Sequence, residues 1–550
     1  MVNFFHPWFK RLPELFDREK KIMESLGFQL DADSLINDKI VRFIGRSRVR
    51  QEYPLIFSYP NGYPSFPPIV ISKVSPDLIL NRHHAPDTGV LCCFGFSNER
   101  WKAYFTAFEV YLEAEQLIVD YPPNGNPPVH DIVPEPRISH FDYEDGNTFL
   151  IPPPFGDMKI EELEGFFKAK LKIVRNKFGT RGILSSIENR ELVHNAVPTY
   201  DEWFSKATVI NAAIRIVKEP PPLEQEQLQS WLNSIGIKPN KSNESWTFIV
   251  FPDEWGIRGR YRATWILLKT IRGINKWIRC YAVNSDDREV RTPHGGELNN
   301  KNVLLVGAGS LGSMVALNLA QEGIGNITLI DSDRYEPANS IRHPVGQTWF
   351  GIPKVVAVED RIKQVSPLTN VDSKAIYIGE DKGRDTYEEF IKALIHADVI
   401  VDTTGHHSVS HYINSICTNL EKKLVVGSVT NGGWSTEVVR YRPGKSGCWV
   451  CWNISYGQTA PPGAPESTMQ FAPGCNQPTF VGAVSDINIA AALTCQMVVN
   501  TLLDDTPKYQ ETGGDYLVWS SRDQLGNWDY AVKVLSNDKN PSCLLCNADD

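Results

Sequence analysis

The sequence has few cysteines, no long apolar run and no repeated or low-complexity segment. Ten cysteines among 550 residues are too sparse for a disulfide framework, so reduced thiols that react or bind metal are expected. No run approaches the roughly eighteen apolar residues of a membrane-spanning helix. The first residues, MVNFFHPWFKRLPELF, lack the basic region, apolar core and cleavage site of a signal peptide. These absences predict a cytoplasmic protein without a membrane partner.

An excess of positive charge is also missing. The net charge is −9 and the pI is about 5.8, which argues against nucleic acid as a partner. The hydrophobic fraction of 42% and the charged fraction of 22% are ordinary for a globular protein. A chain of 550 residues has room for three or four domains of roughly 150 residues each.

A glycine-rich turn lies between an apolar run and a helical pattern in the C-terminal half. Residues 303–306 (VLLV) indicate a buried strand, and three glycines in G-x-G-x-x-G spacing follow it, namely Gly307, Gly309 and Gly312. Such glycines let backbone N–H groups approach a phosphate at a helix N-terminus. A second apolar run, 327–330, ends at Asp331, where a carboxylate commonly binds ribose hydroxyls. The pattern predicts nucleotide binding, but many oxidoreductases share it.

Polar residues after this point narrow the expected nucleotide to ATP. The nucleotide-binding candidates are Asp331, Asp333, Asn339, Arg342 and Lys354. Arg342 and Lys354 suit a triphosphate, whose charge rises in the transition state of adenylyl transfer. The alternative is that both are solvated surface charges. The stretch resembles the ubiquitin-activating superfamily, which includes the adenylyltransferases of molybdopterin and thiamine synthesis.

The next expected strand, 399–401, ends at Asp402. The activating family often has D-x-T-D here, with the second Asp on Mg²⁺, but this chain has Gly405 at that position. Mg²⁺ needs few protein ligands when phosphates supply the rest, so Asp402 is the candidate Mg²⁺ contact. The alternative is that Asp402 caps the turn after its strand.

Two widely separated C-x-x-C pairs lie in the same half of the chain. Four thiolates in paired spacing form a closed tetrahedral zinc site of the structural kind. The gap between the pairs is longer than in common zinc ribbons, but the resemblance implies that activating-family members use such split pairs to hold the C-terminal tail. The candidate Zn²⁺ ligands are Cys448, Cys451, Cys543 and Cys546. Reduced, metal-free cysteines are the alternative.

The segment between the pairs, NISYGQTAPPGAPESTMQFAPGCNQPTF, is rich in Gly, Pro and Ser and predicts a long mobile loop. Thioester-forming activating enzymes carry a nucleophilic cysteine on such a crossover loop. The resemblance therefore implies Cys475 as this nucleophile, and a plain loop thiol is the alternative. Cys417 and Cys495 lie in helical, apolar surroundings and are expected in the core. Residues 286–550 are the expected Rossmann-like, ThiF-type adenylation domain.

The N-terminal part has a different pattern. A helix is expected at 13–27, strands at 40–43, 53–59 and 69–74, and a second helix at 104–119. A Y-P-x-x-P-P loop, a G-x-[IL]-C thiol segment and a following tryptophan resemble the ubiquitin-conjugating fold. These landmarks are Tyr63–Pro68, Gly89–Cys92 and Trp101. The resemblance implies an α+β conjugating-like domain over residues 1–135.

Cys92 is the expected conjugating nucleophile, because acyl transfer between carriers needs a thiol that attacks the acyl carbon and later leaves it. Cys93 is expected to be a small buried hydrophobe and is the runner-up nucleophile. Eukaryotic conjugating enzymes have His-Pro-Asn shortly before the cysteine, where this chain has Arg82-His83-His84. His84 thus replaces the Asn. It could donate to an oxyanion or deprotonate the amine, or it could pack the loop.

The middle of the chain is less informative. Its Pro-rich start, YPPNGNPPVHDIVPEP, is typical of a linker. A helix near 160–174 and strands at 246–252 and 277–281 predict a small α/β module, and Cys280 is expected to be structural. Residues 136–285 are interpreted as a spacer or docking domain.

The domain order resembles the bacterial fusion enzymes found with CBASS antiphage operons. The resemblance implies ATP-dependent activation of the C-terminus of a ubiquitin-like protein or a cGAS-like nucleotidyltransferase. The acyl group would pass through thioesters on Cys475 and Cys92 to the amine of a target protein or small molecule. A cytoplasmic homodimer paired through the adenylation domain is expected, with ATP, Mg²⁺ and structural Zn²⁺.

Three other function classes stay open. A sulfur-carrier adenylyltransferase would share the C-terminal half but has no use for the landmarks around Cys92. An NAD-dependent oxidoreductase leaves Arg342, Lys354 and the zinc cysteines unexplained. A non-catalytic scaffold with a decayed conjugating domain fits the missing Asn and Gly405.

Overall fold

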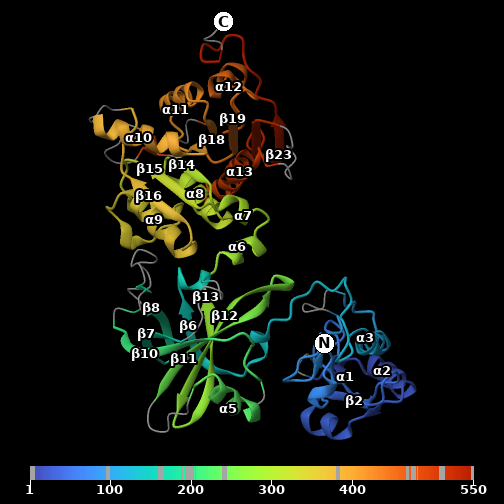
Figure 1. The fold of residues 1–550 in the computed structure, drawn as a ribbon. Helices are drawn as coiled ribbons and strands as arrows, with labels where there is room; N and C mark the ends of the chain where they lie inside the picture. The colour runs from blue at the N-terminus through green and yellow to red at the C-terminus, as the bar shows by residue number, and fades with distance from the viewer. Residues whose placement is uncertain are drawn as a thin grey trace. The chain divides into compact units, whose positions relative to one another are not determined.

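The computed structural model places helices and strands over most of the chain (Figure 1). It describes residues 6–94, 100–158, 166–177, 179–187, 190–191, 204, 206–223, 225–237, 244–379, 384–465, 470–471, 478–479, 481–506 and 514–546. The chain forms two compact units. The first contains Met1–Ile151, Met158–Glu191 and Thr208–Ala282, and the second contains Pro152–Asp157, Leu192–Ala207 and Val283–Asp550.

The N-terminal part of the first unit is an antiparallel sheet in which consecutive strands pair. The strands are β1 (Gln29–Leu30), β2 (Val41–Arg46), β3 (Pro54–Tyr59), β4 (Ile69–Ile71) and β5 (Val90–Leu91). The helices are α1 (Trp8–Arg11), α2 (Pro13–Ser25) and α3 (Ala107–Asp120). The two long helices and three strands expected here are confirmed. Thr106 and Glu109 form a capping box that starts α3.

Two sequence landmarks meet in this domain. The indole Nε1–H of Trp101 donates to the carbonyl oxygen of Pro64 at 2.9 Å, and its ring lies 6.3 Å from that of Tyr63. The Y-P-x-x-P-P loop and the tryptophan therefore pack together, and the Trp101 ring also lies 5.4 Å from that of Phe94, two residues after Cys92.

The middle of the chain forms a second, mainly antiparallel sheet. Its strands are β6 (Tyr143–Ile151), β7 (Phe166–Asn176), β8 (Gly179–Ile187), β9 (Arg190–Glu191), β10 (Thr208–Ile216), β11 (Ser245–Trp255), β12 (Ile257–Ile271) and β13 (Ile274–Ala282). Because β6 pairs with both β13 and β8, the strands close on one another. The helix α5 (Gln225–Ser234) contributes Leu228 and Leu232 to a core with Ile249 and Phe251.

The helix expected near 160–174 is wrong where the structure describes it, because 166–174 lies in strand β7. In KAKLKI the lysines alternate with apolar residues, and Ala169, Leu171 and Ile173 are buried. This period of two is typical of a strand with one buried face.

The second unit is built on one large sheet. Its strand order is β16-β15-β14-β17-β18-β19-β22-β23. The parallel strands are β14 (Asn302–Val306), β15 (Asn326–Ile330), β16 (Asn370–Lys374), β17 (Val399–Asp402) and β18 (Lys423–Val429). The antiparallel strands are β19 (Ser435–Tyr441), β22 (Tyr516–Arg522) and β23 (Trp528–Leu535). Strand β14 lies between β15, which follows it in the chain, and β17. Ligands of open α/β sheets bind beyond the carboxyl ends of the strands where the strand order reverses. The space beyond the carboxyl ends of β14 and β17, called the crevice below, is therefore the expected ligand site.

Helices cover both faces of this sheet. One face carries α8 (Ser310–Glu322), α9 (Lys354–Val365) and α13 (Val484–Leu503), and the other carries α10 (Arg384–His396), α11 (His407–Asn419) and α12 (Trp449–Tyr456). Two short helices, α6 (Asp286–Arg291) and α7 (Gly295–Leu298), precede β14, and two short strands, β20 (Gln470–Phe471) and β21 (Pro478–Thr479), pair with each other.

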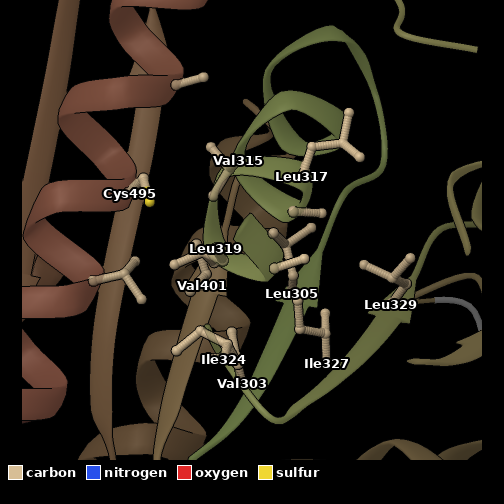
Figure 2. Close-up of a cluster of buried hydrophobic side chains, with 14 of the residues drawn as sticks. Val303, Leu305, Val315, Leu317, Leu319, Ile324, Ile327, Leu329, Val401 and Cys495 are labelled. Carbon is tan, nitrogen blue, oxygen red and sulfur yellow. The ribbon is translucent and has the colours of Figure 1, made fainter. Parts of the chain in front are cut away.

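Side chains alternate between the two faces along β14. Val303 and Leu305 pack with Val315 and Leu319 of α8, and Cys495 of α13 faces the same cluster (Figure 2). Leu304 and Val306 belong to the core on the opposite face. The expected burial of Cys417 and Cys495 is confirmed, and Cys280, which was expected to be structural, is buried in the middle sheet.

In the part of the chain that the structure describes, α13 alone is long and apolar enough to cross a membrane, judged by length and composition. Its most apolar window has a mean hydropathy of 1.3, and 61% of that window is buried inside the domain. The helix contributes Ala490, Ala491 and Val498 to the core beside β14. Its apolar character is accounted for by this packing.

Candidate active site

The glycine turn joins β14 to α8, and at two positions only glycine fits. Gly307 has a φ of +92°, and a Cβ there would lie 2.9 Å from the amide nitrogen of Thr404. A Cβ at Gly312 would lie 1.8 Å from the carbonyl oxygen of Gly307. Gly309 differs, because no atom lies within 4 Å of its Cβ position. The turn is therefore tightly packed inside and open at the N-terminus of α8, where a phosphate would fit.

Asp331 connects this turn to the neighbouring strand. Its Oδ2 accepts the N–H of Ala308 at 2.6 Å, and its Oδ1 accepts the N–H of Asp333 at 2.7 Å. Burial raises the pKa of Asp331, and the positive charge of Lys354 opposes the rise. Asp331 thus holds the shape of the turn, and its contact with a ribose stays a prediction.

Two cationic side chains reach the same end of the sheet. Nζ of Lys354, the first residue of α9, lies 2.8 Å from Oδ2 of Asp333. Nε of Arg342 donates to Oγ of Ser310, the first residue of α8, at 3.4 Å, and burial lowers the pKa of Arg342. Both cations therefore contact residues at or beside the glycine turn, which suits an anionic ligand. Their assignment to individual phosphates stays a prediction.

Asn339 and His343 hold the segment that carries Arg342. Oδ1 of Asn339 accepts the N–H of Glu336 at 3.0 Å. Nε2 of His343 lies 2.9 Å from the carbonyl oxygen of Ala308 in the glycine turn. Burial lowers the pKa of His343 to about 4, so the ring is neutral. Its Nε2–H donates a hydrogen bond to the carbonyl oxygen of Ala308. The pattern N-x-x-R-H contains His343 but gives no reason to assign it this role.

Asp402 ends β17 with both carboxylate oxygens in use. Oδ1 accepts the N–H and the hydroxyl of Thr404 at 2.9 and 2.7 Å, and Oδ2 accepts the hydroxyl of Ser410 at 2.5 Å. The residue is fully buried, and burial raises its pKa. This geometry favours the turn-capping alternative over direct Mg²⁺ contact. Gly405 has a φ of +64°, so an Asp in its place would be strained.

The two C-x-x-C pairs come together at the start of α12, where Cys448 is the N-cap residue. Their four Sγ atoms all lie within 4.8 Å of one another. The Cys448–Cys543 and Cys451–Cys546 sulfurs are 3.6 Å apart, and the Cys448–Cys451 sulfurs are 3.9 Å apart. Four sulfurs at the Zn–S distance of about 2.3 Å are about 3.8 Å from one another in a tetrahedron. The residues therefore fit a structural zinc ion, with no position open for a substrate.

Cys475, the expected first nucleophile, lies outside the described residues.

Cys92, the expected second nucleophile, follows directly after β5. Its N–H donates to the carbonyl oxygen of His83 at 2.9 Å, so the residue is fixed beside the preceding loop. Cys92 is partly exposed, whereas Cys93 is only 5% exposed. Burial raises the pKa of both thiols, and the Glu135 carboxylate raises that of Cys92 further. The expected burial of Cys93 is confirmed, and Cys92 is the more accessible of the two.

His84 is held inside the loop on both sides of its ring. Nε2 lies 2.8 Å from the carbonyl oxygen of Ser72, and Nδ1 accepts the N–H of Leu80 at 3.2 Å. The residue is buried, and burial lowers its pKa, so the ring is neutral with its proton on Nε2. These contacts favour the packing role over the catalytic one.

Side chains that sequence reasoning did not single out surround the same loop. Arg82 contacts Asp131 of the Pro-rich linker and Glu254 of the middle sheet. His83 contacts Asp131 and Glu135 of the linker. The sequence carries no signal for these pairs, because the partners lie far apart along the chain.

Comparison with known proteins identifies the C-terminal region. Residues 288–520 match the ThiF family model. This region is therefore similar to the ThiF family, and the expected fold class, a mixed α/β multidomain chain with a Rossmann-like ThiF-type domain, is confirmed.

Three relatives illustrate the range of similarity. The uncharacterized protein y4oA of Sinorhizobium fredii is 31% identical over 282 residues, which are 49% of this chain and 45% of that protein. The ATP-dependent ubiquitin transferase-like protein Cap2 of Enterobacter hormaechei is 25% identical over 227 residues, 40% of this chain and 36% of that protein. The sulfur carrier protein adenylyltransferase of Thermus thermophilus is 26% identical over 194 residues, 35% of this chain and 69% of that protein.

The chain spans less than half the length of y4oA and of a second such protein, y4qC. Among solved structures, Escherichia coli MccB with ATP is 21% identical, with a TM-score of 0.34 over 46% of this chain and 68% of that one.

Proposed function

We propose that this protein activates the C-terminal carboxylate of a carrier protein with ATP and conjugates it to an amine. The carrier is a ubiquitin-like protein or a cGAS-like nucleotidyltransferase. The observation that carries the proposal is a ThiF-type domain with an open, cation-flanked glycine turn in the same chain as a partly exposed Cys92 at a strand end. One part suits adenylation and the other suits thioester transfer.

For the first step, the chain supplies a phosphate site and positive charge. The open side of the turn at Gly309 and the N-terminus of α8 would hold the phosphates of ATP. Arg342 and Lys354 would stabilise the charge that develops when the carrier carboxylate attacks the α-phosphorus and pyrophosphate leaves. Mg²⁺, held mainly by the phosphates, would neutralise part of that charge.

For the second step, two thiols would pass on the acyl group. The Cys475 thiolate would attack the acyl-adenylate and release AMP, and the Cys92 thiolate would then attack the resulting thioester and release Cys475. An amine of the acceptor would attack the Cys92 thioester, forming the C–N bond as the C–S bond breaks. The relative named ubiquitin transferase-like supports this path.

A sulfur-carrier adenylyltransferase is the second candidate, supported by the similarity to the Thermus protein of that name. It accounts for the crevice but gives Cys92 no role. A non-catalytic scaffold is supported by the packing of His84 and the capping role of Asp402, but the open space at Gly309 is unexplained by it. The place in antiphage defence rests on the resemblance of the domain order, the homodimer on the resemblance to activating domains, and the cytoplasmic location on the sparse cysteines.

The test is to incubate the protein with ATP, Mg²⁺ and a candidate carrier, and to look for an adduct that a reducing agent removes. We expect ATP–pyrophosphate exchange in all cysteine variants, no adduct transfer in Cys475→Ala, and loss of the second adduct in Cys92→Ala. The matched control is Cys93→Ala, which removes the neighbouring buried thiol. ATP–pyrophosphate exchange without any thioester in the wild type would instead support the sulfur-carrier candidate. The absence of ATP–pyrophosphate exchange would contradict both the conjugation and the sulfur-carrier candidates.

A further inference from the structure

The loop that precedes Cys92 is held by residues from outside its own sheet. The Arg82 side chain is only 10% exposed, and its Nε lies 3.1 Å from Oδ2 of Asp131. Its Nη2 contacts the carbonyl oxygen of Val133. The linker therefore lies directly against the loop that carries the Cys92 hydrogen-bond partner, His83.

Glu254, near the end of β11, joins the loop, the linker and the middle sheet. Its Oε2 accepts from Nη2 of Arg82 at 3.0 Å and from the N–H of Glu135 at 2.8 Å. Its Oε1 accepts the N–H of Gly259 at 3.1 Å. The side chain is 11% exposed, so this charged pair is largely removed from solvent and its electrostatic interaction is stronger than that of a surface pair.

Glu135 is thereby fixed against His83, the residue that is hydrogen-bonded to Cys92. Its carboxylate accepts the N–H of His83, and its Oε1 lies 3.3 Å from Nδ1 of the same residue. On the other side of the ring, Nε2 of His83 lies 3.2 Å from Oδ2 of Asp131. His83 in turn accepts the N–H of Cys92. Glu135, whose negative charge raises the pKa of Cys92, therefore belongs to the linker. Its backbone N–H is held by Glu254 of the middle sheet.

We propose that Glu254 is a positioning residue for the conjugating site, which holds Arg82 and the Glu135 backbone so that the Glu135 carboxylate stays beside Cys92. The middle sheet is then part of the site and more than a spacer. The consequence for conjugation rests on the proposed function. A fixed carboxylate attracts a cationic amine and accepts the proton that the amine must lose, and the departing Cys92 thiolate then takes up that proton.

The first measurement does not depend on that function. Alkylation of Cys92 with iodoacetamide is followed by mass spectrometry across pH 6–10 in the full-length wild type and in three variants. Glu135→Gln removes the carboxylate, Glu254→Gln removes its anchor, and Glu244→Gln is the matched control. Glu244 pairs with Arg175 on the same sheet, through a contact of 3.1 Å.

We expect Glu135→Gln and Glu254→Gln to shift the alkylation profile of Cys92 to lower pH, with about threefold faster labelling at neutral pH. Glu244→Gln should leave the profile unchanged. The positioning role is overturned if Glu135→Gln shifts the profile and Glu254→Gln does not, or if the control shifts it equally. Should Glu254→Gln unfold, Arg82→Gln breaks the same contact from the loop side and must give the same shift.

The second measurement tests the consequence. A wild-type Cys92 thioester is mixed with free lysine, and its discharge is timed. We expect Glu254→Gln to lower the maximal discharge rate about tenfold while ATP–pyrophosphate exchange is unchanged. The effects of Arg82→Gln and Glu254→Gln should be less than additive, because both break one contact. If the wild type forms no thioester on Cys92, the proposed function fails while the alkylation profiles still decide the positioning role.

Discussion

The glycine-turn crevice and the Cys92 loop are built in different ways. The glycine turn is held mainly from within residues 303–354, through Asp331, Arg342 and His343, and otherwise by the end of β17, where the Thr404 backbone packs on Gly307 and the Thr403 hydroxyl donates to the Gly307 carbonyl oxygen. The Cys92 loop is held instead by Asp131, Glu135 and Glu254, up to 172 positions from Arg82. The glycine turn, which offers backbone N–H groups, is thus held mainly by residues that are near it in the sequence. The carboxylates at the Cys92 loop come from residues that are distant in the sequence.

Because contacts between distant residues form at a larger cost in chain entropy, the two regions should respond differently to substitution. Local substitutions should disturb the crevice directly. The Cys92 loop should respond to changes in the linker and the middle sheet.

The largest effect is expected at the cluster of four cysteines, whose two C-x-x-C pairs are distant from each other in the sequence. Removing its metal, or changing Cys543→Ser, should lower the free energy of unfolding by about 5 kcal/mol, because a structural zinc ion holds the C-terminal tail only in the folded state. Metal analysis should find about one zinc ion per wild-type chain, and a chelator should no longer change the melting temperature of the variant. Cys417→Ala, which alters a buried thiol outside the cluster, is the control and should retain zinc. A wild type without zinc contradicts the assignment.

The next effect tests the local encoding of the crevice. Gly312→Ala should destabilise the second unit by about 3 kcal/mol, because the added Cβ would lie 1.8 Å from the Gly307 carbonyl oxygen and the backbone must shift. Gly309→Ala has free space at its Cβ position and should leave the stability unchanged while it weakens ATP binding. Urea unfolding and ATP–pyrophosphate exchange separate the two effects. Equal stabilities for both variants would argue against the tight turn.

The third prediction concerns pH and His343. Its pKa is about 4 in the folded protein and about 6.5 in the unfolded chain, so the unfolded chain binds more protons between these values. The stability contributed by the neutral ring is complete above pH 6.5 and is lost as the pH falls toward 4. We expect a loss of about 2 kcal/mol between pH 7 and pH 5.

Urea unfolding at both pH values of the wild type and of His343→Gln measures this contribution. Gln retains a donor for the Ala308 carbonyl but does not titrate in this range, so the variant should lack that part of the pH dependence. An identical pH dependence of the two proteins would refute the assignment. Subtraction also removes the opposite contribution of Asp331, whose raised pKa favours folding at low pH.

The smallest effect is expected where the linker meets the middle sheet. Oδ1 of Asp253 accepts the N–H of Arg137 at 2.7 Å, and Oδ2 accepts the N–H of Ile138 at 2.9 Å. Asp253→Asn should cost about 1 kcal/mol, because one acceptor is lost while a charge that burial disfavours is removed as well. Thermal unfolding measures the cost, with the exposed Asp145→Asn as control. If the Cys92 loop depends on the linker, Cys92 alkylation should change in Asp253→Asn and not in the control.

The elements with a strong local signal were predictable. The strand 303–306 and the helix after it follow from the apolar pattern around the glycine turn, and both are present. The helix expected near 160–174 failed in its described part, because acidic and leucine residues at its start favour a helix while the lysine alternation after Phe167 favours a strand. A segment that combines both periods is decided by its partners, here β8 and β10.

The candidate site shows the same division at the level of single residues. Arg342 and Lys354 could be selected from their position after a glycine turn. His343 could not, because its role depends on burial and on one carbonyl oxygen. His84 and Asp402 could be selected as polar residues at informative positions, but only their contacts show that both are saturated by the protein itself.

By itself, the sequence determined the glycine turn, the two cysteine pairs and the Gly89–Cys92 thiol segment, because these depend on steric limits and spacings within a few residues. Only the tertiary structure decided that the four cysteines converge and that Glu135 and Glu254 reach the Cys92 loop. The physical reason is that such contacts join residues on separate elements, and their geometry exists only once the sheets have packed.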